Sequence, residues 1–218
     1  MIGIGSNGKA IAGLQELFAS ATHDASAAMC RWTNGVISVT LDEVREVQLE
    51  EVGTELALGD EMLTMVVMTL DGELGGSMMV IFDDLNGRQL AASLLGRDAG
   101  TEPEWSELEK SALMETGNIL GCAYVNALTR LIDGDLRPSA PYFVQDFGVS
   151  VLQQALTSQA AASDTLLLCE IGFQRRGGRL DWRVVFVPTP GLQTSLRRSL
   201  HAVPEDAQEI SRHLDHTQ

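Results

Sequence analysis

Apolar positions follow two different periods along the chain, and the order of these periods repeats. From about Gly13 to Thr33 the apolar residues recur at helical spacing, as Leu14, Phe18, Ala21, Ala25, Met29 and Trp32. This spacing predicts an amphipathic helix with that stripe in the core. Asn34-Gly35 ends the helix, and "VISVTL" then alternates as a short strand does.

The rest of the first half predicts a connection, a β-hairpin and a helix. The connection is "EVREVQLEEV", and the hairpin is "EMLTMVVMTL-DG-ELGGSMMVIF" with Asp71-Gly72 as its turn. The segment "LNGRQLAASLLG" predicts the helix that closes this half.

The same order returns in the second half. A long helix is predicted in "TEPEWSELEKSALMETGNILGCAYVNALTRLI", where Thr101 and Glu104 have capping-box spacing and Pro103 lies in the first turn. A proline loop, "RPSAP", and a helix within "DFGVSVLQQALTSQ" are expected next. The segment "TLLLCEIGFQ-RRGG-RLDWRVVFV" predicts a second hairpin, and "GLQTSLRRSLHA" predicts a closing helix.

The repeat predicts a single α+β domain over residues 1–218. Its pseudo-repeats cover about 8–98 and 101–205, and a polar tail follows at 206–218. Because each half is a long helix, a strand, a β-hairpin and a helix, the strands of both halves can form one antiparallel sheet covered by helices. The 218 residues, 44% of them apolar, are enough to bury such a core.

Composition narrows the function classes. A net charge of −15 with only two lysines gives a surface that repels phosphate backbones and anionic lipid, so neither nucleic acid nor a membrane surface is expected as a partner. No apolar run approaches the roughly 20 residues that cross a bilayer. The N-terminus also lacks the basic start of a signal peptide, so we expect a cytoplasmic protein.

No metal site is expected from the sequence. Cys30, Cys122 and Cys169 are too far apart for a CxxC motif or a disulfide framework, and they are predicted to be buried or half-buried thiols. The four histidines include no H-x3-H pair.

Three polar residues share one face of the second long helix. At about 100° per residue, Ser111, Glu115 and Asn118 fall within an arc of about 60°. The opposite face carries an apolar stripe of Leu113, Leu120, Tyr124, Ala127 and Leu131. The polar face is therefore expected to point outward. Gly117 and Gly121 each cost the helix about 1 kcal/mol relative to alanine, which predicts close packing against another element.

A glutamate and an asparagine three positions apart are usually no more than a solvated helix face. The longer pattern is more specific: with Ser111 before the pair and Pro141 after it, the chain has S-x3-E-x2-N-x22-P. This pattern, with "SALMETGNILGCAYVNAL" around it, resembles the signature of the CheC/CheX/FliY family of chemotaxis response-regulator phosphatases. The layout in two halves resembles CheC over nearly the whole chain.

The resemblance implies a function and a role for each residue. It implies a hydrolase that removes the phosphate of a phosphoaspartate from a CheY-like receiver domain in two-component chemotaxis signalling. Asn118 would position the attacking water, Glu115 would dock against the receiver's active-site lysine, Ser111 would lie at the rim, and Pro141 would shape the neighbouring loop. No cofactor of its own is implied, because Mg²⁺ is expected on the receiver. The resemblance also implies a CheD-like deamidase as a second partner.

The first half lacks most of this motif. A step of 99 positions back from Asn118 reaches Ala19, and the same step from Pro141 reaches Asp42. Glu16 still corresponds to Glu115 and is expected to face outward. The family pattern therefore predicts one working site, with Glu16 marking a degenerate one. His23 lies on the same face and stays open as a substitute.

Other readings remain beside a phosphatase. One is a non-catalytic module that binds a response regulator or the flagellar switch, as the FliM middle domain does in the same fold. Arg175, Arg176 and Arg179 form a basic patch at a hairpin tip, which serves either solubility or partner docking. A metal-dependent hydrolase is disfavoured, because no clustered set of His, Asp and Glu is found.

Overall fold

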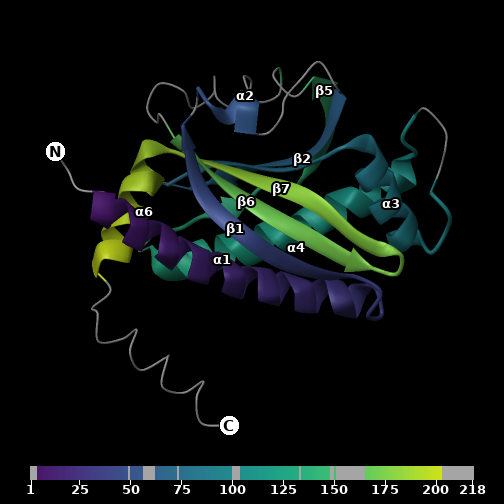
Figure 1. Ribbon diagram of the computed structural model, residues 1–218, viewed down its shortest axis with the longest axis horizontal. Helices are drawn as coiled ribbons and strands as arrows, with labels where there is room; N and C mark the ends of the chain where they lie inside the picture. The colour runs from purple at the N-terminus through teal and green to yellow at the C-terminus, as the bar shows by residue number, and fades with distance from the viewer. Residues whose placement is uncertain are drawn as a thin grey trace, which may run out of the picture.

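The computed structural model describes residues 4–48, 50–55, 62–72, 74–99, 104–132, 134–147, 150 and 165–202. Figure 1 shows the elements in chain order, which are α1 (Ile4–Trp32), β1 (Ser38–Gln48), α2 (Val52–Glu55), β2 (Met62–Asp71), β3 (Gly76–Phe82), α3 (Asp84–Leu95), α4 (Glu107–Leu131), β4 (Arg137–Pro138), β5 (Tyr142–Phe147), β6 (Thr165–Arg175), β7 (Gly178–Pro188) and α6 (Pro190–Ala202). None of the helices described is long and apolar enough to cross a bilayer.

The strands form one antiparallel sheet of seven strands. Its order is β1-β6-β7-β3-β2, and both β4 and β5 pair with the far side of β2. The two hairpins meet in the middle, where β3 pairs with β7. Each outer strand pairs with the hairpin of the other half, β1 with β6 and β5 with β2. This arrangement confirms the α+β fold with two pseudo-symmetric halves.

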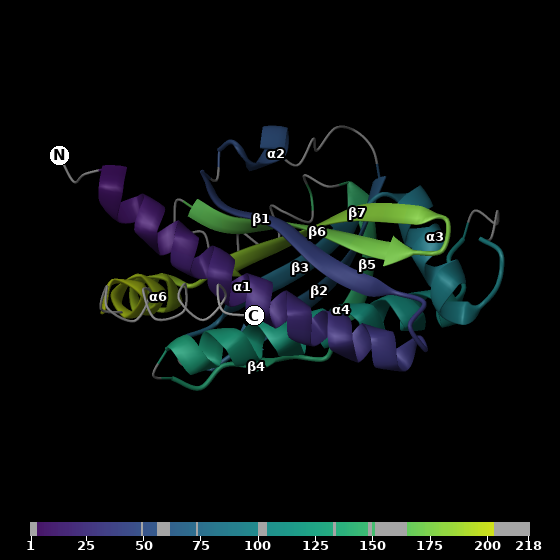
Figure 2. The same ribbon diagram turned by 60° about the horizontal axis from the view of Figure 1, so that its bottom comes forward.

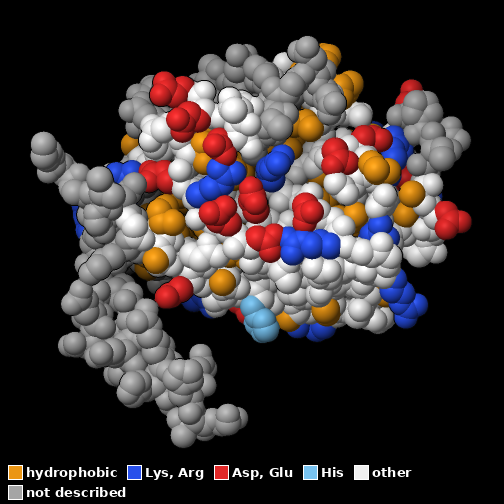
Figure 3. All heavy atoms as spheres, in the orientation of Figure 1, with side chains coloured by type: hydrophobic (Ala, Val, Ile, Leu, Met, Phe, Trp, Pro, Cys, Tyr) orange, Lys and Arg blue, Asp and Glu red, His pale blue; other side chains and the backbone are white. Residues whose placement is uncertain are grey.

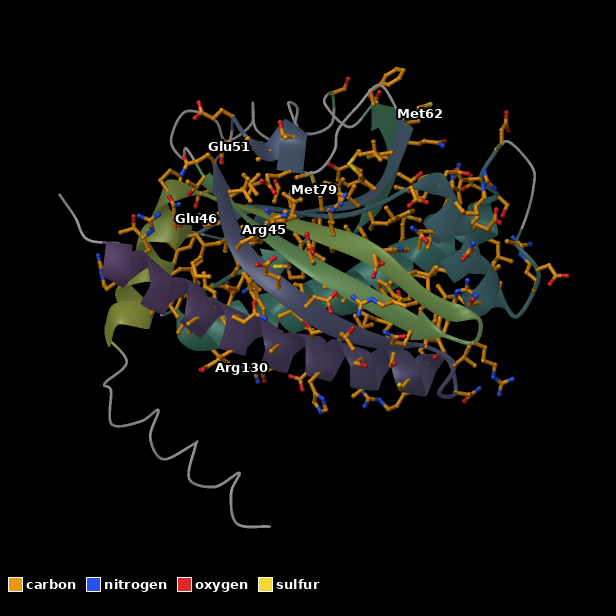
Figure 4. All side chains as sticks on the ribbon, viewed as in Figure 1. Arg45, Glu46, Glu51, Met62, Met79 and Arg130 are labelled. Carbon is orange, nitrogen blue, oxygen red and sulfur yellow. The ribbon has the colours of Figure 1, made fainter. Side chains whose placement is uncertain are left out.

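Helices α1 and α4 cross the same face of the sheet, with α6 near one end and α3 near the other (Figure 2). The main core lies beneath them. The two long helices contact each other there: the rings of Phe18 and Tyr124 stack with centroids 5.2 Å apart, and the hydroxyls of Thr22 and Tyr124 hydrogen-bond at 2.9 Å. On the opposite face, Val52 of α2 and Met79 of β3 belong to a smaller apolar cluster (Figure 4).

The start of α1 and the end of β1 were predicted wrongly. Helix α1 begins at Ile4 rather than near Gly13, because its buried stripe continues back through Ala10. The residues predicted as a connection extend β1 to Gln48. A β-bulge interrupts the pairing between Leu41 and Glu43. Beyond it, Val44 packs in the main core and Val47 in the cluster on the other face, so the simple alternation is hidden.

The first hairpin has a longer loop than the predicted two-residue turn at Asp71-Gly72. Strand pairing ends at Leu70 and Gly76, so residues 71–75 connect the strands. Gly72 has φ 130° and lies directly against the backbone carbonyl of Asp135, where a Cβ would collide. The glycine therefore serves a close backbone approach rather than a tight turn.

The second half also departs from the prediction at two places. The predicted capping box at Thr101 and Glu104 is wrong, because Glu104 precedes a helix that begins at Glu107; Thr101 and Pro103 lie outside the described residues. Within the predicted proline loop and helix, β4 and β5 pair with β2 instead, and Asp146 and Phe147 end β5. The predicted helix covers 146–159: Ser150 is helical, whereas 148–149, 151–159 and the polar tail at 206–218 lie outside the described residues.

The remaining second-half elements follow the prediction. Strands β6 and β7 form the hairpin, with Arg175 paired to Gly178 across its turn. Helix α6 follows directly, as "GLQTSLRRSLHA" predicts.

Candidate functional site

An open hollow of about 570 Å³ lies over the first half of α4. Its lining contains all four residues of the sequence pattern: Ser111, Glu115 and Asn118 from α4, and Pro141 from the segment between β4 and β5. The other lining residues are Trp32, Leu95, Leu108, Ala112, Met114 and Ala140. The structure thus brings together residues that are up to 30 positions apart in the pattern.

The buried face of α4 determines which way this motif points. Leu113, Leu120, Tyr124 and Ala127 are each at most 2% exposed and pack in the main core. Ser111 and Glu115 are exposed on the other side, and Asn118 is half-buried. The outward face predicted from the helical period is therefore confirmed.

Two glycines let α4 lie directly on β2. A Cβ at Gly117 would come within 2.5 Å of Cγ1 of Val66, and one at Gly121 within 2.7 Å of Sδ of Met68. The predicted close packing is confirmed, and it explains two residues that weaken a helix by about 1 kcal/mol each. Asn118 follows the first of these contacts, so its backbone is held against the sheet.

The N-terminus of α4 is fixed by a capping box just before Ser111, the first residue of the motif. The Ser106 hydroxyl accepts a hydrogen bond from the Glu109 backbone N–H, and the Glu109 carboxylate accepts one from the Ser106 N–H at 2.9 Å. Arg97 pairs with the same carboxylate at 3.0 Å. Burial alone would raise the pKa of Glu109, but the Ser106 hydrogen bonds and the charge of Arg97 outweigh it and hold that pKa below its usual value.

Cys122 lies one turn after Asn118 and contacts its side chain. The Cys122 thiol donates to Oδ1 of Asn118 with the sulfur 3.7 Å from the oxygen. Burial, together with the carboxylate of Glu115, raises the pKa of Cys122, so the sulfur keeps its proton at neutral pH. This contact engages Oδ1 of Asn118, a residue that also lines the hollow. All three cysteines are buried or half-buried, as predicted.

The segment that carries Pro141 is tied to the edge of β2. The backbone N–H of Ser139 donates to the carbonyl of Thr69 at 2.8 Å, and the backbone N–H of Thr69 donates to the Ser139 hydroxyl at 3.0 Å. Pro141 has no N–H to donate and contributes shape instead. Pro141 lies at the wall of the hollow, and its loop-shaping role stays a prediction.

The prediction that Trp32 belongs to the core stripe is wrong. It is the last residue of α1, is 42% exposed, and lines the same hollow as the motif. Leu108, which is 58% exposed, lines the hollow from α4. The helical period gave no sign of this, because position 32 continues the stripe in sequence while the helix ends beside the hollow.

The first-half counterpart is built differently. Glu16 and Ala19 are exposed on α1, so Glu16 faces outward as predicted, but the alanine has no carboxamide. Asp42, in the place of Pro141, accepts from the guanidinium of Arg179. His23 is exposed on α1, seven positions beyond Glu16, or about two helical turns.

Two of the three arginines of the predicted basic patch have side-chain contacts within the protein. Arg179 pairs with both Asp42 and Asp181, and Arg175 donates to the side-chain carbonyl of Gln89. Hydrogen bonds to Asp181 and Asp42 raise the pKa of Arg179. Acidic and basic side chains are likewise interleaved on the face in Figure 3, where Arg45 of β1 pairs with Glu55 and Glu170 (Figures 3 and 4). Among the described residues, no three His, Cys, Asp or Glu side chains form a group that could hold a metal ion.

Comparison with known proteins agrees with this architecture. No protein-family model matches the sequence. The chain is 28% identical over 138 residues to the CheY-P phosphatase CheC of Bacillus subtilis, covering 62% of this chain and 66% of that one. It is 22% identical over 123 residues to CheC1 of Halobacterium salinarum, covering 56% and 62%. The chain thus spans just under two thirds of the length of these two relatives.

Solved structures share the fold. FliY of Thermotoga maritima aligns with a TM-score of 0.67 at 16% identity, over 88% of this chain and 96% of that one. The FliM middle domain of Helicobacter pylori aligns with a TM-score of 0.61 at 10% identity, over 86% and 96%. CheX, in a CheX–CheY complex with BeF3 and Mg²⁺ from Borrelia burgdorferi, aligns with a TM-score of 0.50 at 16% identity, over 78% and 96%.

The resemblance to the CheC, CheX and FliY family is confirmed. The CheC-like chain carries the fold of these proteins over most of its described length, with the motif of the second half on the outer face of α4.

Proposed function

We propose that this CheC-like chain hydrolyses the phosphoaspartate of a CheY-like receiver domain in chemotaxis signalling. The observation that carries the proposal is the gathering of Ser111, Glu115, Asn118 and Pro141 around one open hollow on a firmly packed helix. The curated relative from Bacillus subtilis, a CheY-P phosphatase, supports the same reaction. The CheX–CheY complex with BeF3 and Mg²⁺ supports a CheY-like partner that carries Mg²⁺.

Asn118 is the residue proposed to position water. Its carboxamide can donate to and accept from a water molecule, and it needs no shifted pKa for this. The water oxygen would attack the phosphorus in line with the bond to the receiver's aspartate. That P–O bond breaks, the aspartate leaves as a carboxylate with the electron pair, and the water proton passes to the phosphate or to solvent. The gain comes chiefly from orientation, as with the water-positioning glutamine of GTPases.

Glu115 is proposed to dock the partner. Its exposed carboxylate lies one turn before Asn118 in the same hollow. A negative charge at this place repels a free phosphate ion and attracts a partner that presents a cation next to its phosphate, such as the lysine of a receiver. An exposed ion pair is worth only about 0–1 kcal/mol, and desolvation in an interface increases its contribution.

Decay of the phosphorylated receiver tests the proposal. Asn118→Ala is expected to reduce the accelerated decay by about 100-fold, the size of effect that loss of orientation produces. Asn126→Ala is the matched control, because Asn126 is an exposed asparagine on the same helix, outside this hollow. Equal rates for wild type and Asn118→Ala would remove Asn118 from the mechanism. Binding of the receiver without any acceleration by wild type would instead favour a non-catalytic module of the kind found in FliM.

A further inference from the structure

We propose that Trp32 and Leu108 form a docking rim that binds the receiver domain around the phosphorylated aspartate. This inference rests on the proposed function and assigns partner recognition to residues outside the S-x3-E-x2-N-x22-P pattern. Trp32 comes from the end of α1, in the half whose own motif is degenerate. The first half would thus contribute to the site of the second.

Trp32 and Leu108 differ from the other exposed large apolar side chains, such as Leu85, because both line the hollow. Trp32 is 42% exposed and Leu108 is 58% exposed, and both line the same hollow as Glu115 and Asn118. The other two tryptophans are buried, Trp105 at 5% exposure and Trp182 at 2%. Exposed apolar side chains gathered at one hollow are typical of a surface that a partner covers.

The position of Asn118 determines what must cover them. Asn118 is half-buried in the hollow, and a water that it positions must approach the phosphorus to about 3–3.5 Å. The receiver's phosphorylated site therefore has to enter the hollow. The surface around that site then contacts Trp32 and Leu108. The half-buried Leu95 of α3 lines the hollow with them, so the apolar lining comes from three helices that are far apart in sequence.

The chemistry of the rim complements that of the motif. Glu115 offers one charge in the hollow, and the attraction of this charge for a cation falls with added salt. Trp32 and Leu108 offer apolar area, and buried tryptophans are among the residues that contribute most to interface affinity. The rim is therefore expected to govern affinity, while Asn118 governs the rate of the bound complex.

Binding of a receiver that carries beryllium fluoride and Mg²⁺ tests this inference without turnover. The probe is each CheY-like receiver of the source organism in that form. Trp32→Ala is expected to raise the dissociation constant at least tenfold, and Leu108→Ala is expected to raise it several-fold. Leu85→Ala is the matched control, since Leu85 is 65% exposed on α3 and lies outside the hollow; its binding should stay within twofold of wild type. Thermal melting of each variant establishes that it folds, and Leu108→Glu gives a second disruption of the rim.

Intrinsic fluorescence gives an independent readout. Because Trp32 is the exposed one of the three tryptophans, its burial by the receiver should shift the emission to shorter wavelength and protect it from acrylamide, and Trp32→Phe should remove that change. Wild-type affinity in both Trp32→Ala and Leu108→Glu, or no binding of any receiver, would overturn the rim. Binding that needs Trp32 but gives no phosphate release would support the docking role of the rim and contradict the proposed phosphatase function. Phosphate release with an unchanged KM in Trp32→Ala would contradict the docking role of the rim and leave the proposed function intact.

Discussion

Helices α1 and α4 occupy corresponding places in the two halves, yet they are packed by different means. The residues 99 positions before Gly117 and Gly121 are Phe18 and Thr22, and both of these contact Tyr124 of α4. Thus α4 lies directly on β2 through glycines, while α1 uses a large side chain to fill the space between the helices. The half with the complete motif is thus the half whose long helix packs on the sheet through glycines.

The two helices also differ in the polar residues at their motif positions. Asn118 corresponds to Ala19, and Pro141 corresponds to Asp42, which is engaged by Arg179. Only the glutamates remain alike, Glu115 and Glu16, and both are exposed. A duplicated fold can therefore keep its packing in both halves while the groups suited to chemistry stay in one. Trp32, which lines the same hollow from α1, is the contribution that we propose for the other half.

The largest expected effect comes from breaking the close packing of α4. Gly117→Ala would press a methyl group against Val66, a β-branched residue in the core with little freedom to rotate. Overpacking of this kind costs roughly 1–3 kcal/mol, from which about 1 kcal/mol of helix propensity is regained. We expect the free energy of unfolding, measured by urea denaturation, to fall by up to about 2 kcal/mol.

The matched change on α1 is Gly13→Ala. A Cβ there would meet Cδ2 of Leu200 at 2.8 Å, which is the far end of a flexible side chain. Stability should change by less than about 0.5 kcal/mol, because the leucine can turn away and the helix gains propensity. An equally small effect of Gly117→Ala would show that the glycines of α4 do not set its distance from the sheet.

A smaller effect is expected at the N-terminus of α4. Its first turn is held by the carboxylate of Glu109, whereas the first turn of α1 has no acidic residue. Glu109→Gln keeps the shape of the capping box and removes the charge that faces Arg97. Thermal melting at pH 7 should show a loss of about 0.5–1 kcal/mol. Glu107→Gln serves as the control, because Glu107 is in the same turn and its side chain is 89% exposed.

The effect of Glu109 also has a defined pH dependence. Its pKa is lower in the folded protein than its ordinary value of 4.5. The charge therefore stabilises the fold above pH 4.5, and this contribution is lost as the pH falls through the lower folded pKa. The difference between wild type and Glu109→Gln should shrink in acid. A difference that grows below pH 4.5 would mean that burial, rather than Ser106 and Arg97, dominates at this carboxylate.

The smallest expected effect concerns the charge within the hollow itself. Because Glu115 contributes to the raised pKa of Cys122, Glu115→Gln should increase the thiolate fraction and the rate of alkylation by iodoacetamide at pH 8. We expect an increase of less than about fivefold, followed on the peptide that carries Cys122. Ser111→Ala changes the same face without a charge and should leave the rate unchanged. No response to Glu115→Gln would mean that the carboxylate and the thiol are separated by solvent.

The sequence predicted the local elements well and the long-range ones poorly. The long helices, both hairpins and the closing helices follow from apolar period alone. Strand β5 does not, because "YFVQDF" becomes a strand by pairing with the hairpin of the other half. The extension of β1 was hidden by its bulge. The true cap of α4 was visible, since Ser106 and Glu109 have capping-box spacing immediately before the apolar stripe.

In the candidate site too, residues close together in sequence could be predicted, and residues from distant elements could not. Ser111, Glu115 and Asn118 lie within two turns of one helix, so their common face could be calculated, and Pro141 joined them through the longer pattern. Trp32 and Leu95 reach the hollow from other helices, and only the three-dimensional structure brings them there. The roles of the motif residues in phosphate release remain predictions.

The two corresponding glutamates offer the most direct test of the central claim, that α4 carries the working site and α1 does not. Decay of a phosphorylated CheY-like receiver should be followed with wild type, Glu115→Ala and Glu16→Ala at receiver concentrations below KM. The account predicts about a tenfold loss of kcat/KM for Glu115→Ala, as for removal of a docking charge in an interface. It predicts a rate within twofold of wild type for Glu16→Ala. An equal loss in both variants would mean that both halves act, and a loss confined to Glu16→Ala would place the site on the wrong helix.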